Sequence, residues 1–129
     1  MIRQQTVQVD TTGSAGSAVG AANTPQPVWG KILKVRINYH ASAPATTDVT
    51  ITERVGSTDW ETIHTETNSL TDVTRYPRRA VEDNAEATVT YDGTNEIYEP
   101  FVVYGYVRVA VAQADALTAC VLVDIFYER

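Results

Sequence analysis

The chain has little of several residue types that particular protein classes require. Its 129 residues include one cysteine, Cys120, so no internal disulfide forms and a disulfide-stabilised scaffold is excluded. Its two histidines, His40 and His64, show no metal-ligand spacing, and no nucleotide-binding or cofactor motif is present. Ten Lys and Arg residues against 16 Asp and Glu give a net charge of −6. This charge argues against nucleic-acid binding, because neutralising phosphates needs a surplus of cations.

Long apolar segments are also missing. Arg108 and Asp124 interrupt the two most apolar stretches, so neither predicts a bilayer span. The first residues lack the apolar run of a secretory signal, and we expect a protein that stays in the cell producing it. The length favours one domain over residues 1–129.

The chain is rich in Val, Thr, Ile and Tyr in period-2 order, which is typical of half-buried antiparallel strands. The order predicts an all-β fold, an antiparallel β-sandwich or jelly-roll-like barrel of seven or eight strands, with an immunoglobulin-like sandwich as the main rival.

Residues 68–86 are predicted to be a long surface connection. Residues 117–127 are apolar on both faces, which favours a central strand or one covered by another subunit. Strands are expected over residues 6–10, 31–39, 47–55, 61–67, 87–91, 102–112 and 117–127.

Residues 1–27 are interpreted as an extended N-terminal arm. A strand pattern containing Val7 and Val9 precedes a stretch rich in Gly, Ser and Ala that ends in Pro25 and Pro27. Such a strand on a slack tether either lies along its own domain or is exchanged with a neighbouring subunit, which is a known route to oligomers. Both alternatives remain open from the residues alone.

Residue combinations typical of catalysis are absent, and no catalytic, cofactor-binding or metal-binding residue is predicted. No serine lies in a nucleophile elbow, and the glycine-rich stretch lacks the Lys-Ser/Thr ending of a phosphate-binding loop. Residues 82–86 carry clustered acids without the glycine-centred spacing of a calcium loop, which favours a solvated charge run. The hypothesis is therefore a protein that is not an enzyme.

Two surface features instead suggest macromolecular contacts. The segment 75–79 places three arginines and a tyrosine in five residues, suited either to docking on an acidic partner or to balancing Glu82 and Asp83. Tyr104 and Tyr106 share the outward face of their predicted strand, as in an interface, a sugar-binding platform that also uses Trp29 or Trp60, or packing against a second sheet. The candidate protein-interface residues are Val7, Val9, Trp29, Arg75, Tyr76, Arg78, Arg79, Tyr104 and Tyr106.

Taken together, several segments resemble the small β-rich structural proteins of tailed-phage heads, often decoration (cement) proteins. The resemblance rests on residues 6–10, the Gly/Ser/Ala tether, and residues 30–32, 45–51, 91–95, 100–101 and 107–116.

The resemblance implies a jelly-roll-like domain, usually a homotrimer, on the capsid exterior where major-capsid subunits meet. Its partners would be itself and the major capsid protein, without membrane, nucleic acid or cofactor, and it would be made in the host cytoplasm. A carbohydrate-binding β-sandwich module, or a head-completion or tail protein, are the alternatives.

Overall fold

The protein is all-β, as its residue alternation predicts. The structure, a computed structural model, describes all 129 residues and contains ten strands and no helix, hence no helix that could cross a membrane. The strands are β1 (Ile2–Val9), β2 (Ala18–Asn23), β3 (Val28–Tyr39), β4 (Asp48–Val55), β5 (Thr58–Glu66), β6 (Val73–Arg75), β7 (Arg78–Ala80), β8 (Tyr98–Pro100), β9 (Val102–Ala114) and β10 (Val121–Glu128).

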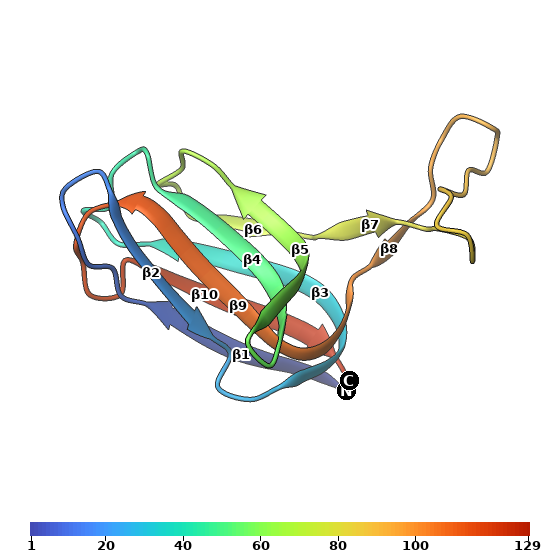
Figure 1. The fold of residues 1–129 in the computed structure, drawn as a ribbon, viewed down its shortest axis with the longest axis horizontal. Coiled ribbons are helices and arrows are strands. Elements are labelled where there is room, and N and C mark those ends of the chain that lie inside the picture. The colour runs from blue at the N-terminus through green and yellow to red at the C-terminus, as the bar shows by residue number, and fades with distance from the viewer.

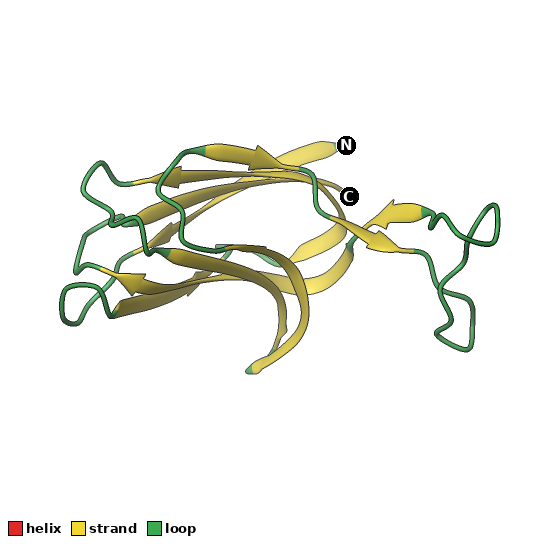
Figure 2. Cartoon of the chain, turned by 90° about the horizontal axis from the view of Figure 1, so that it is seen from above, coloured by secondary structure: helices red, strands yellow, loops and turns green.

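Eight of these strands form two antiparallel layers packed as a sandwich (Figures 1 and 2). One layer has the order β1-β10-β3-β6, and the other has the order β2-β9-β4-β5. The layers join at one end, where Val28 to Lys31 of β3 pair with Val102 to Gly105 of β9. The β-sandwich expected from the sequence is thus confirmed.

The core lies between the two layers and consists of the inward positions of each strand. In β9, the buried residues include Val103, Val107 and Val109, while Tyr104 and Tyr106 face outward, as the alternation predicts. β10 lies between β1 and β3, which confirms a central strand. In β3 the alternation is broken, because a bulge opposite Phe126 and Tyr127 of β10 puts Ile32 in the core and leaves Leu33 half-buried.

The N-terminal segment lies within its own domain. β1 pairs along its whole length with β10, and this places Val7 and Val9 in the core with at most 1% of their surface exposed. These two valines therefore pack inside their own domain rather than lining its surface, which differs from their prediction as interface residues. A buried apolar side chain contributes more to stability than an exposed one, and this favours the packed position.

The Gly/Ser/Ala-rich tether contains a strand that its composition does not predict, β2, which pairs with β9. One of its glycines has a steric reason: a Cβ added at Gly20 would lie 2.1 Å from the carbonyl oxygen of Asp10. Composition suggests a slack linker here, but at Gly20 the lack of a side chain is required because two segments of backbone meet closely.

The sequence also did not predict a projecting arm, residues 76–100, which leaves the sandwich between β6 and β9 (Figures 1 and 2). Its base is the two-stranded pair β7–β8. The predicted connection over 68–86 in fact contains β6 and β7, and the predicted strand over 87–91 is reduced to isolated bridges at Thr88 and Thr90. No residue between 78 and 100 is buried.

Candidate interaction surfaces

The arginine-rich segment 75–79 does not form one continuous basic patch. Arg75, at the end of β6, forms an ion pair with Glu66 of β5, and Glu66 also contacts His64 Nε2 at 2.6 Å. The hydrogen bond from Arg75 is the largest influence on the Glu66 carboxyl and lowers its pKa. Pro77 is buried and Tyr76 is exposed. This part of the segment therefore joins the two layers along an open side of the sandwich.

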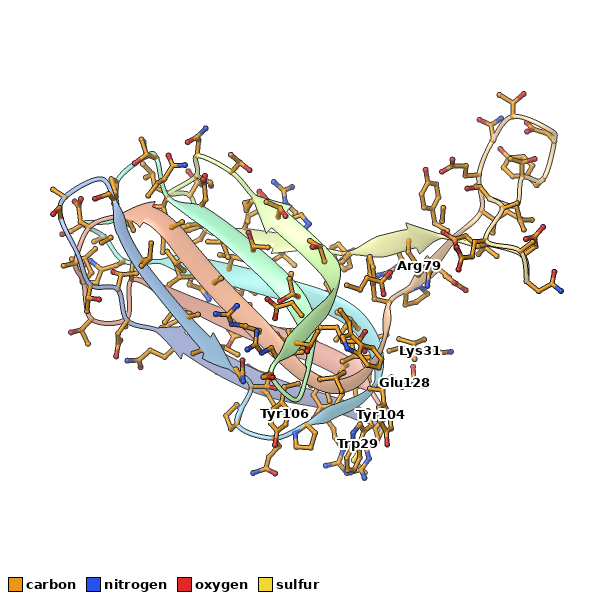
Figure 3. All side chains as sticks on the ribbon, viewed as in Figure 1. Trp29, Lys31, Arg79, Tyr104, Tyr106 and Glu128 are labelled. Carbon is orange, nitrogen blue, oxygen red and sulfur yellow. The ribbon has the colours of Figure 1, made fainter.

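The other two arginines mark the base of the arm. Arg78 Nη1 donates to the backbone carbonyl oxygens of Leu33 and Pro77 and pairs with no carboxylate. Arg79 lies at the arm base (Figure 3), 3.5 Å from Glu82 and 3.9 Å from both Glu61 and Glu99. The predicted alternative, in which this segment balances neighbouring acids, is confirmed for Arg79 and Glu82.

The tip of the arm, residues 81–99, carries a charge equal to that of the whole chain. It holds six carboxylates and no cation, and the remaining residues hold ten cations and ten anions. Two of the six, Asp83 and Asp92, accept hydrogen bonds from nearby backbone amides and hold the turns of the arm. The acids of the tip are Glu82, Asp83, Glu86, Asp92, Glu96 and Glu99.

The tip also exposes apolar area. Tyr91 is 70% exposed, Tyr98 61% and Ile97 40%. Three hydrogen bonds link Val81, Val89 and Ile97 in a ring, each amide donating to the carbonyl oxygen of the next. The arm thus holds its shape by local hydrogen bonds while most of its surface has no partner.

A second surface lies at the end of the sandwich where the two layers join. Trp29 of β3 and Tyr104 of β9 are cross-strand partners, and their rings stack with centroids 6.4 Å apart (Figure 3). The guanidinium of Arg129 lies over the Trp29 ring at 5.6 Å. Gly30 allows the end of β10 to lie close to β3, since a Cβ at this position would lie 2.0 Å from the carbonyl oxygen of Glu128.

The other predicted aromatic residues lie apart from this pair. Tyr106 is 37% exposed on the outer face of β9, where its register partner is Arg54 of β4. Trp60, 63% exposed, lies on β5 at the sheet edge. Of the four aromatic residues considered for a platform, the structure therefore stacks only Trp29 and Tyr104.

Beside Trp29, an open groove of about 710 Å³ runs between β1, the β2–β3 loop and the end of β10. Gln5 links two sides of the groove: its Nε2 donates to the Tyr127 hydroxyl, and its Oε1 accepts a hydrogen bond from the backbone amide of Gln26. Sequence reasoning missed this groove, because its residues are distant in the chain and show no local motif. The lining residues are Arg3, Gln4, Gln5, Pro25, Gln26, Pro27, Trp29, Tyr127 and Arg129.

The structure brings together no group of three or more His, Cys, Asp or Glu residues that could hold a metal ion. Cys120 is buried, and burial raises the pKa of its thiol. A raised pKa keeps a cysteine protonated and unreactive at neutral pH.

Comparisons with known proteins give little further guidance. No family model and no curated protein matches the chain. A solved structure of a mutant of CBM29-2, a family 29 carbohydrate-binding module, is similar at 14% identity and a TM-score of 0.37, covering 98% of this chain and 80% of that chain. These values are too low to support an argument about function.

Proposed function

We propose that this protein is a non-enzymatic structural component of a virion, a decoration (cement) protein that binds the outer capsid between major-capsid subunits and stabilises the shell. The observation that carries the proposal is the arm over residues 76–100. A two-stranded hairpin is at best marginally stable alone in water, and this one buries none of residues 78–100 in its own domain. Exposed tyrosines on such an element favour a protein partner.

Charge separation supports the same proposal. The acids of the tip project away from a body of balanced charge, so a cationic surface on a lattice would attract the tip first. In a homotrimer, three arms would engage equivalent sites, and the second and third contacts would form at high effective concentration. Binding only the assembled lattice would stabilise it by mass action.

The proposal is tested by replacing residues 82–96 with a short Gly-Ser turn and measuring co-sedimentation of the full chain and the variant with capsids that lack this protein. We expect the intact protein to bind and to delay thermal rupture of the shell, and the variant to do neither. Light scattering after size exclusion tests the oligomer separately. Equal capsid binding by both proteins would remove the arm from the mechanism, and a lack of binding by the intact protein would refute the function.

A second candidate function is carbohydrate binding. The stack of Trp29 and Tyr104 beside an open groove favours it, because ligand sites combine aromatic faces with a few directed polar groups. A glycan array of varied neutral and charged sugars tests this function, and binding by the intact chain that a Trp29→Ala variant loses would support it. Silence of the array would exclude it for the glycans presented.

A further inference from the structure

The groove beside Trp29 differs in charge from the rest of an acidic chain. Its nine lining residues include two arginines, Arg3 and Arg129, and no Asp or Glu. Neither guanidinium lies within 4.0 Å of a carboxylate, whereas Arg54, Arg75, Arg79 and Arg108 all do. Two cations without a carboxylate partner therefore lie at one concave site, with Arg129 over the Trp29 ring. A guanidinium binds carboxylates through paired hydrogen bonds.

The floor of the groove supplies further donors in a fixed orientation. Tyr127 is 5% exposed, and its hydroxyl accepts a hydrogen bond from Gln5 at 3.0 Å. That hydroxyl donates to no protein atom, so its proton is free for a ligand in the groove. The side-chain amides of Gln4 and Gln26 add groups that can both donate and accept, which suits hydroxyl-rich ligands.

The loop wall of the groove is poorly suited to binding an extended peptide as an added strand. Pro25 and Pro27 have no backbone N–H, and the amide of Gln26 already donates to Gln5 at 2.8 Å. An added strand needs such backbone donors for its ladder. Recognition at this wall therefore falls to side chains and to the exposed Trp29 ring, and the volume is within the usual range for small-ligand sites of ~300–1,000 Å³.

We propose that this groove binds a carboxylate-bearing sugar, such as a hexuronate or sialic acid residue of a glycan. Arg3 and Arg129 bind the carboxylate, the Tyr127 hydroxyl and the glutamine amides bind the hydroxyl groups, and the Trp29 ring borders the sugar. This inference rests on carbohydrate binding, the second candidate function, and is independent of capsid decoration.

The test uses isothermal titration of the full chain with sialyllactose and oligogalacturonate, and with lactose as the neutral control. We expect an acidic sugar to bind at least tenfold more tightly than lactose. An Arg3→Gln variant should lose roughly tenfold in affinity, which corresponds to about one charge-assisted hydrogen bond. Lys31→Gln is the matched control, because it removes the same charge from an exposed residue that does not line the groove, and it should bind as the wild type does.

The possible results distinguish the carboxylate preference of the groove from carbohydrate binding in general. Equal affinity for lactose and acidic sugars, lost in Trp29→Ala, would overturn the carboxylate preference and leave carbohydrate binding intact. No binding of any sugar would overturn both. Equal losses in Arg3→Gln and Lys31→Gln, or equally tight binding of a glutamate-rich peptide, would reduce the effect to general charge attraction and also overturn the inference. Matching thermal unfolding midpoints confirm that each variant is folded.

Discussion

The sandwich and the projecting arm are built from similar residues, yet they hold their shapes by different means. Both contain valine, isoleucine and tyrosine in extended segments, but the sandwich buries a cluster of 21 core residues while no residue between 78 and 100 is buried. Extended backbone therefore does not by itself produce a stable β-structure, because stability requires a second layer against which to bury the apolar face. The arm has the hydrogen bonds of a β-structure without that layer.

The largest expected contrast compares an isoleucine from each region. Ile37 of β3 is fully buried, so Ile37→Ala should lower the free energy of unfolding by about 2–5 kcal/mol. Ile97 in the arm is 40% exposed, and Ile97→Ala should change it by less than about 0.5 kcal/mol. Urea unfolding followed by tryptophan fluorescence measures both, and similar losses would show that the arm packs against something in the isolated protein.

A second contrast uses glycines. A Cβ at Gly30 would lie 2.0 Å from the carbonyl oxygen of Glu128, so Gly30→Ala should separate β3 from the end of β10 and lower stability by roughly 1–3 kcal/mol. Gly93 in the arm has a φ of 83° and open space around it, and asparagine tolerates this conformation. Gly93→Asn should be neutral within about 0.5 kcal/mol in thermal unfolding. If Gly30→Ala does not change the free energy of unfolding, the ends of β3 and β10 can move apart without loss of stability.

The third contrast compares how a carboxyl group in each region makes stability depend on pH. The pKa of Glu66 in the body is lowered chiefly by the hydrogen bond from Arg75, and the pKa of Asp92 in the arm is lowered chiefly by the Asn95 backbone amide. A carboxyl with a lowered folded-state pKa contributes stability that is fully present above its ordinary value, 4.5 for glutamate, and is lost as pH falls through the folded-state pKa.

We therefore expect Glu66→Gln to reduce the stability of the sandwich at neutral pH and to flatten its decline below pH 4.5, measured as urea midpoints across the acid range. Asp92→Asn should leave the urea midpoint of the sandwich unchanged, since the fully exposed turn that Asp92 holds can open without unfolding the core. An identical pH profile for the wild type and Glu66→Gln would remove this ion pair from the acid response.

At the junction of the two regions, we expect a local effect with little change in global stability. Arg79 is partly exposed and lies 3.5–3.9 Å from three carboxylates, so Arg79→Gln should change global stability by less than about 1 kcal/mol. Its local effect should be faster hydrogen exchange at Val81 and Ile97, with exchange in β3 and β9 unchanged. Faster exchange throughout the sandwich would show that arm and body open together.

The fold class and most strands of the sandwich follow from the order of residues along the chain. Val103, Val107 and Val109 alternate with outward residues, and this period fixes which face is buried whatever the partner strand. The sequence also contains the acidic run of the arm, since six carboxylates between residues 81 and 99 are visible without coordinates.

The remaining features do not follow from the order of residues, because each depends on contacts between residues far apart in the chain. β2 is a strand because β9 lies beside it, although its small residues suggest a linker. The groove arises where Arg3, Gln26 and Tyr127 meet, and the arm projects because no second layer covers residues 78–100. Local periodicity specifies which side of a strand faces the core, whereas long-range pairing specifies which strands and loops become neighbours.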